Sequence, residues 1–287
     1  MTVALPAVRE LGLHSLFLKA ARAVARRLGA SKHSYTLQER QIRDAIGQHH
    51  FPLGIGVHPH ERAAREALAN PSDPVGAIRE TLRAYYSCVQ PKTPAEWLDL
   101  PDAHPDLVNN PSYAATFPWH ANSPSKWIEV RSKGIPGENK LAGDEISIEH
   151  GWNACGPVSE RKLEVETTRV ARLYHSIREA GFIRHDGKDG DIDAVILRTP
   201  NGERWWINFG HHRAPVLAAF GYETLPVRIR KVFDISKVES WPQVRSGLFT
   251  PEQAVLITER LIAGRLPSVT KPWTDLLESG DPLRLAS

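Results

Sequence analysis

The chain of 287 residues has little cysteine and only a small excess of positive charge. Its two cysteines, Cys88 and Cys155, lack metal-ligand spacing and are too few for a framework of bridges, which predicts a reducing compartment. No run approaches the ~18 apolar residues of a membrane span, and the N-terminus has no apolar core ending in a cleavage site. We therefore expect a cytoplasmic protein, neither secreted nor integral to a membrane.

The charge balance is close to neutral. Lys and Arg total 36 against 33 for Asp and Glu, which gives a formal net charge of +3. Proteins that follow a nucleic-acid backbone usually concentrate positive charge in a stripe, so this balance does not by itself indicate such a partner. The apolar content of 41% is enough for a buried core of ordinary size.

Helical periodicity dominates residues 1–90, which are expected to form a helical N-terminal region. The predicted helices cover residues 11–28, 36–47 and 74–86. The first has an apolar face with Lys and Arg around it. It packs on its own domain or, alternatively, makes a peripheral contact with the inner face of the membrane.

Prolines and tryptophans punctuate residues 91–155, where helical and strand patterns fade. A segment so rich in aromatic residues is not a disordered linker, so we expect irregular chain wrapped over a folded body. Cys155, at the end of this segment, has no paired base in the sequence and is expected to be a small buried residue.

Regular patterns return in residues 156–234. The predicted elements are a helix (162–180), a hairpin of two strands (192–198 and 204–209), a helix (210–220) and a last strand (226–233). Residues 235–287 are expected to form a C-terminal helical extension, with one clear helix capped by Thr250. The whole pattern predicts an α+β fold built around a small α/β domain.

The junction between the second strand and the following helix predicts an anion site. The chain leaves the strand at Phe209 and turns through Gly210, so free backbone amides point outward at the helix start. Arg213 offers a planar fork to phosphate oxygens, and His211 and His212 can donate hydrogen bonds. The alternative is that the histidines pack locally and Arg213 forms a surface ion pair.

The sequence from Asn208 to Arg213, followed by residues 218–227, resembles the nucleotide-binding box of the ParB/sulfiredoxin superfamily. Here the box reads Gly-His-His-Arg, where partition ParB proteins have Gly-Glu-Arg-Arg, sulfiredoxins Gly-Cys-His-Arg and the superfamily's free-serine kinases Gly-His-x-Arg. The similarity extends to residues 176–181 and 190–192. The rest of the chain resembles ParB-like proteins associated with bacterial surface-polysaccharide loci.

The resemblance implies a site for ATP or ADP with Mg²⁺, and phosphate transfer or hydrolysis as its chemistry. Sulfinic-acid repair is not expected, because His211 stands where sulfiredoxins have their reactive cysteine. Specific DNA binding is not expected either, because no helix-turn-helix pattern follows residue 234.

Phosphoryl transfer also needs charge neutralisation and a group near the acceptor hydroxyl. On a helix, the side chains of Lys162, Glu166 and Arg169 share one face. We assign catalytic roles to Glu166 and His212, and place Lys162, Arg169 and Asp191 with the box as cofactor-binding residues. The alternative is a solvated helix with intrahelical ion pairs.

The metal ligands stay unassigned. His49-His50 and His58-Pro59-His60 suggest a metal, but they lack the spacing for shared ligation on one helix, and we assign them no acidic partner. Three functions remain open. The first is a kinase-like phosphotransferase acting on a hydroxyl of a sugar, glycan or small molecule, and the second is a nucleotide-binding switch or scaffold without fast turnover. The third, less expected, is a CTP- and DNA-binding ParB-type protein.

Overall fold

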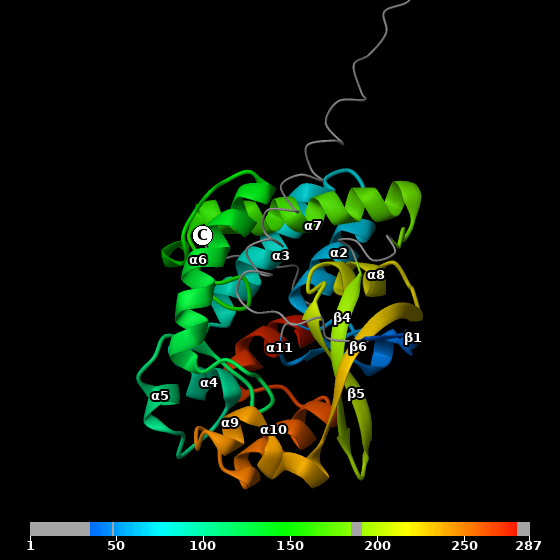
Figure 1. Cartoon of the computed structure of the whole chain (residues 1–287). Coiled ribbons are helices and arrows are strands. Elements are labelled where there is room, and N and C mark those ends of the chain that lie inside the picture. The colour runs from blue at the N-terminus through cyan, green and yellow to red at the C-terminus, as the bar shows by residue number, and fades with distance from the viewer. Residues whose placement is uncertain (1–34, 48, 185–190, 280–287) are drawn as a thin grey trace, which may run out of the picture.

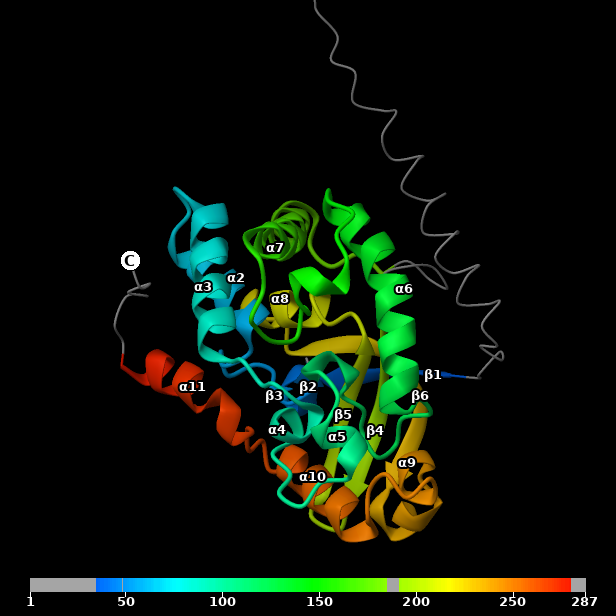
Figure 2. The same ribbon diagram turned by 90° about the vertical axis from the view of Figure 1, so that its left-hand side faces the viewer.

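A six-stranded mixed sheet runs through the protein, with helices packed around it (Figures 1 and 2). The structure is a computed structural model that describes residues 35–47, 49–184 and 191–279. The strands are β1 (Thr36–Gln41), β2 (Ala45–Gly47), β3 (Phe51–Pro52), β4 (Ile192–Thr199), β5 (Gly202–Phe209) and β6 (Thr224–Asp234). Their order across the sheet is β1-β6-β4-β5-β2-β3. The expected α+β class is confirmed.

The helices come from every part of the described chain. They are α2 (Pro59–Ala69), α3 (Pro74–Cys88), α4 (Pro94–Leu98), α5 (Pro105–Val108), α6 (Pro124–Ala142), α7 (Glu160–Ala180), α8 (Arg213–Ala219), α9 (Pro242–Arg245), α10 (Pro251–Ile262) and α11 (Lys271–Glu278). The predicted helices at 74–86 and 162–180 are confirmed as α3 and α7. The predicted helix at 11–28 lies outside the described residues.

The hairpin β4–β5 is the centre of the sheet, and its predicted strands are confirmed. β5 runs antiparallel to β4, while β6 returns through α8 to lie parallel to β4 on its other side. Ile196 and Trp205 face a core beneath α2, α3, α7 and α8, whereas Leu197 and Trp206 face a second core beneath α4 and α10. Both faces are covered, so the central strands are apolar on both sides.

The prediction of a helix at residues 36–47 is wrong. This stretch forms β1, a short 3-10 turn and β2. β1 pairs antiparallel with the edge of β6, and β2 pairs parallel with β5, where Ala45 lies opposite Trp205. Partners more than a hundred residues away therefore determine the local structure, as tertiary pairing commonly overrides local preference.

The prediction of irregular chain over residues 91–155 is wrong for Pro124–Ala142, which forms the 19-residue helix α6. Ser123 caps this helix by accepting a hydrogen bond from the Lys126 amide, and Pro124 takes a first-turn position. Proline is favoured there because that position needs no helical amide. Pro94 and Pro105 begin α4 and α5 in the same way. Several prolines of this segment therefore start helices.

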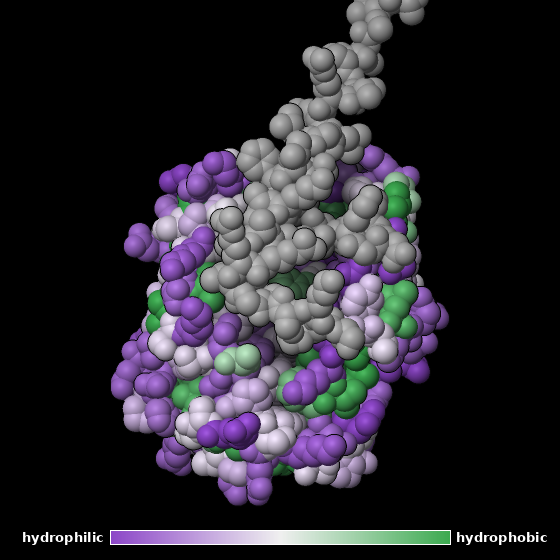
Figure 3. All heavy atoms as spheres, viewed as in Figure 1, coloured by the Kyte–Doolittle hydropathy of each residue, from purple (hydrophilic) through white to green (hydrophobic). Residues whose placement is uncertain are grey.

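The face of the molecule seen in Figure 3 is largely hydrophilic where described residues form it, with apolar side chains scattered among polar ones. The described helices include none with the length and apolar content needed to cross a membrane. The predicted C-terminal helix is confirmed as α10, whose Thr250 and Gln253 side chains cap each other's backbone amides.

Candidate functional site

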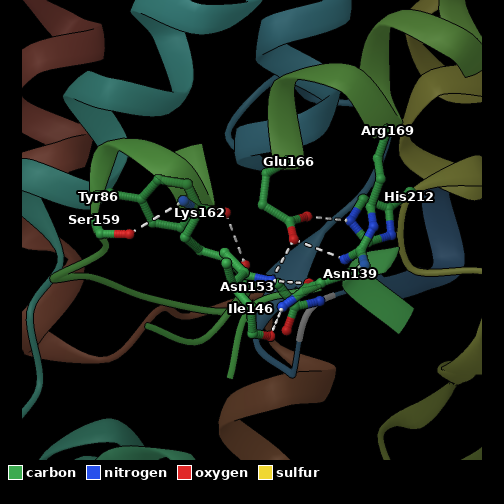
Figure 4. Close-up of polar contacts among 9 residues, drawn as sticks. All are labelled: Tyr86, Asn139, Ile146, Asn153, Ser159, Lys162, Glu166, Arg169 and His212. Carbon is green, nitrogen blue, oxygen red and sulfur yellow. Dashed lines mark hydrogen bonds and ion pairs between the residues drawn. The ribbon is translucent and has the colours of Figure 1, made fainter. Parts of the chain in front are cut away.

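Three segments of the chain meet beside the start of α8. Helix α7 supplies Lys162, Glu166 and Arg169, and the turn after β5 supplies His212. Asn139 reaches the same group from α6, as Figure 4 shows. The structure thus brings together four of the residues predicted from sequence, and we refer to Lys162, Glu166, Arg169 and His212 as the charged cluster.

Ser159 caps the start of helix α7. The Ser159 hydroxyl accepts a hydrogen bond from the Lys162 amide at 3.2 Å. This start turns Lys162 and Glu166 toward the interior, where their side chains are 2% and 0% exposed. Glu164, two residues before Glu166, points to solvent and is 56% exposed. The alternative of a solvated face is therefore wrong for Lys162 and Glu166, which belong to a buried network.

Glu166 contacts three nitrogen-bearing side chains. Its Oε1 lies 2.6 Å from Lys162 Nζ and 2.7 Å from Arg169 Nη1, and its Oε2 lies 2.7 Å from His212 Nε2. Burial raises the pKa of the Glu166 carboxyl, but Lys162 and Arg169 outweigh it and hold that pKa well below its ordinary value. Glu166 is therefore a permanent carboxylate.

The directly paired groups carry more positive than negative charge. Lys162 and Arg169 contribute two cations against the single Glu166 carboxylate. Burial lowers the pKa of Lys162, while the neighbouring Glu166 opposes that shift. A buried group with surplus positive charge favours an anion nearby, because the anion offsets desolvated charge.

Asn139 fixes the two cations in place. Its Oδ1 accepts hydrogen bonds from Lys162 Nζ at 2.8 Å and Arg169 Nη2 at 3.0 Å. Its Nδ2 donates to the Ile146 carbonyl at 2.8 Å, so every polar group of this fully buried amide is used. No local pattern singles out Asn139, because the cations that it binds come from another helix.

Gly210 makes the turn into α8. Its φ of +96° is the left-handed region, and an added Cβ would lie 3.0 Å from Ile192 Cγ1. Only glycine adopts this conformation without strain. The helix predicted to begin at residue 210 begins instead at Arg213, and His212 is its N-cap. The His212 side chain makes no cap hydrogen bond and turns to Glu166.

The two box histidines contact different neighbours. The His211 ring faces His49 and Trp206, with ring centres 6.0 Å and 6.4 Å away. Burial lowers the pKa of His211 to about 4, so its ring is neutral near pH 7. Arg213 lies at the first position of α8 and is partly exposed. The structure therefore brings His212, and not His211, to Glu166.

Asp191 lies outside the charged cluster. Its carboxylate pairs with Arg228 of β6, and its Oδ1 lies 3.4 Å from Arg184 Nε. Its side chain is 2% exposed. The contacts of Asp191 are those of an ion pair beside the sheet, and they do not link it to His212.

His60 is the functional candidate that the sequence interpretation left out. Its ring stacks on His212 with centres 4.4 Å apart and planes inclined by 16°. Burial, and then the neighbouring His212, lower the pKa of His60 to about 3, so the ring is neutral. The acidic residue that folding brings to His60 is Glu166. The adjacent Glu61 is held by the Gly54 and Gly56 amides and by Arg65. The His58-Pro59-His60 motif was the only feature of the sequence that pointed to His60.

Two surface cavities lie elsewhere. One of about 550 Å³ is lined by Val75, Thr168 and His175, and another of about 680 Å³ by Thr93 and Ser268. Neither is lined by Glu166 or His212. The candidate site is therefore marked by the convergence of charged side chains.

A model of a known protein family matches part of the chain. Residues 148–240 match the model of the ParB N-terminal domain. No curated protein matches the chain. No solved structure matches it either. The matched segment contains α7, the β4–β5 hairpin, α8 and β6, and hence Glu166 and His212, but neither His60 nor Asn139. Residues 148–240 therefore form a segment similar to the ParB N-terminal domain.

Proposed function

We propose that the ParB-like segment binds ATP or ADP and transfers a phosphoryl group to a hydroxyl of a sugar, glycan or other small molecule. The observation that carries the proposal is the 2.7 Å contact between Glu166 Oε2 and His212 Nε2. It joins the charged face of α7 to the Gly-His-His-Arg box, so phosphate-binding and proton-accepting groups can act on one ligand.

The surplus positive charge of the cluster supports a phosphate ligand. Lys162 and Arg169 share one carboxylate, and Arg213 begins the adjoining helix. Phosphoryl transfer proceeds largely by positioning the phosphates and stabilising their charge, which such groups supply. In this proposal the phosphates lie over the box, within reach of Arg213.

His212 takes the acceptor proton in the proposed reaction. Glu166 holds Nε2 of the ring, which leaves the other ring nitrogen for the acceptor hydroxyl. As that nitrogen receives the proton, the hydroxyl oxygen bonds to the terminal phosphorus of the nucleotide. The bond from this phosphorus to its bridging oxygen breaks, and the shortened nucleotide leaves. Glu166 is too strongly paired to be the base, so its role is to position His212.

Mg²⁺ would be held mainly by the nucleotide. Magnesium prefers oxygen ligands, and Glu166 is the only carboxylate of the charged cluster. That carboxylate already contacts Lys162, Arg169 and His212. The residues of the cluster therefore do not form a dedicated magnesium site, and phosphate oxygens with water would complete the coordination.

A binding module without fast turnover is the second candidate. It is favoured by the burial of Lys162 and Glu166, since buried ion networks also serve to fix a conformation. Nucleotide occupancy would then switch the contacts of α7 and α8. For either function we propose a cytoplasmic location and a role beside surface-polysaccharide synthesis, with a peripheral membrane contact through residues 11–28 as an option. Specific DNA binding is not part of the proposal.

A thermal-shift panel tests the proposal. The full chain is mixed with ATP, ADP, CTP or GTP, each with Mg²⁺. A ligand that binds only the native state at about 100 times its Kd adds about 2.7 kcal/mol to the free energy of unfolding. We expect ATP or ADP to raise the Tm and to be consumed with an acceptor present. Binding without consumption would favour the switch, a response to CTP alone would favour the ParB-type alternative, and no response would refute nucleotide binding.

A further inference from the structure

We propose that His60, Glu166 and His212 form a binding site for a divalent transition-metal ion of the Zn²⁺ type. This inference goes beyond nucleotide binding, because it concerns the ion alone. The three residues come from α2, α7 and the N-cap of α8. One potential ligand atom of each lies within 4.8 Å of the other two. The structure therefore assembles a three-residue donor set from distant parts of the chain.

The donor set matches a known preference of metal ions. Two imidazoles and one carboxylate form a common set of protein ligands for catalytic zinc, which leaves a position for water or substrate. Imidazole nitrogen suits Zn²⁺, Co²⁺ and Ni²⁺, whereas Mg²⁺ and Ca²⁺ prefer oxygen. The site should therefore discriminate against the Mg²⁺ that accompanies a nucleotide.

His60 supplies an independent sign that a ligand is missing. Its Nε2 is buried and has no hydrogen-bond partner among the described residues. Buried polar atoms usually have partners, and those without one mark a place for an ion or water. His58 stands next to His60 and braces it, since His58 Nδ1 accepts a hydrogen bond from the His60 amide at 3.1 Å. A metal ion bound to His60 Nε2 would give this buried nitrogen a partner.

The cations around Glu166 would oppose the ion, but they have another acceptor. Lys162 and Arg169 each donate a hydrogen bond to Asn139 Oδ1 as well as contacting Glu166. Glu166 can therefore share its charge with an ion without leaving either cation unbound. The nearby positive charge should nevertheless weaken binding relative to a site built of uncommitted ligands.

Cobalt binding tests this site without any nucleotide. The full chain is stripped with a chelator, dialysed and titrated with Co²⁺, whose visible absorption reports nitrogen and oxygen ligands in a distorted site. Zn²⁺ is then added to displace the signal, and Mg²⁺ is added in a parallel sample. We expect saturable Co²⁺ absorption that Zn²⁺ removes and an equal concentration of Mg²⁺ does not.

Variants identify the ligands. His60→Gln should weaken Co²⁺ binding by more than about tenfold, and His212→Gln provides a second ligand deletion should the first variant unfold. His175→Gln is the control, because His175 is exposed on α7. Circular dichroism and Tm confirm folding. The site is refuted if the wild-type protein takes up no Co²⁺, or if a folded His60→Gln or His212→Gln variant binds as the control does. Because no nucleotide is present, these outcomes are independent of the thermal-shift panel.

Discussion

The Glu166 carboxylate and the His212 imidazole lie 2.7 Å apart, although 46 positions separate them in the chain. The contact connects the middle of α7 to the residue that caps α8. Because the carboxylate is fully buried and permanently charged, it also fixes which ring nitrogen of His212 carries a proton. The geometry of the box thus depends on a side chain outside it.

Replacing Glu166 by Gln should abolish turnover while nucleotide binding persists. The amide keeps the shape of the carboxylate but loses the charge that holds His212, and a positioned proton acceptor contributes about 100- to 10,000-fold to the rate. The loss should appear in kcat rather than in KM. Steady-state kinetics of nucleotide consumption, with calorimetry for binding, measure the two effects separately.

Glu164→Gln is the matched control for this experiment. Glu164 is 56% exposed and pairs with Arg79, which is itself exposed, so its loss should change stability by less than about 1 kcal/mol. Glu166→Gln leaves the buried Lys162 with less charge compensation and should cost about 3 kcal/mol or more. If it unfolds, His212→Gln serves instead, since His212 is 20% exposed. Normal turnover in a folded Glu166→Gln variant would contradict the catalytic proposal.

Replacing Arg213 by Ala should weaken nucleotide binding. A charge-assisted hydrogen bond to phosphate is worth about 1.5–3 kcal/mol, which corresponds to roughly a tenfold to 150-fold rise in Kd. Arg213 is partly exposed at the first turn of α8, so the fold should persist. Titration calorimetry measures the change, with Arg245→Ala as the control, because Arg245 is exposed at the end of α9. Equal affinities for the two variants would remove Arg213 from the site.

Asn139→Ala should destabilise the protein by about 2–3 kcal/mol. The substitution takes an acceptor from Lys162 and Arg169 and leaves the buried Ile146 carbonyl without its donor. Unpartnered buried polar groups carry this order of penalty. Urea unfolding provides the measurement. Asn110→Ala is the control, since Asn110 makes one exposed hydrogen bond, and equal losses for the two variants would mean that Asn139 does not hold the cluster together.

Local pattern was sufficient to predict α7 and the hairpin. The spacing of Lys162, Glu166 and Arg169 predicted that their side chains share one face of the helix. The turn residues between the two strand patterns predicted the hairpin. Such signals lie within a few residues and need no knowledge of the rest of the fold. They did not reveal that this face is buried, because the same spacing occurs on solvated helices.

The missed features depend on contacts between distant segments. The role proposed for His60 depends on Glu166 and His212, which are distant in the chain. The neighbouring Glu61 instead accepts hydrogen bonds from the Gly54 and Gly56 amides. The strands of residues 36–47 form because β5 and β6 offer edges to pair with. Pro124 stands in the first turn of α6. Proline both begins helices and interrupts them, so the prolines of this segment were interpreted as breaks in regular structure.

The two cysteines should differ sharply in reactivity. Burial raises the pKa of the Cys155 thiol to about 12, a shift that the hydrogen bond to Ser112 and the charge of Arg131 only partly oppose. Cys155 is 1% exposed, whereas Cys88 at the end of α3 is partly exposed and has a pKa raised by burial alone. Because the thiolate is the nucleophile, a thiol with a pKa near 12 reacts negligibly with alkylating reagents at pH 8, where only about one molecule in 10,000 is ionised.

Iodoacetamide labelling followed by peptide mass spectrometry measures this difference. We expect Cys88 to be labelled in the folded protein, at a rate that rises with pH as its thiol ionises. Cys155 should stay unlabelled until denaturant exposes it, because raising the pH from 7 to 9 still leaves it below its pKa of about 12. A Cys88→Ser variant isolates the Cys155 signal. Labelling of Cys155 in that folded variant at the rate of Cys88 in the wild type would mean that residues around 155 open readily, and that the core beside Trp152 is less closed than its burial indicates.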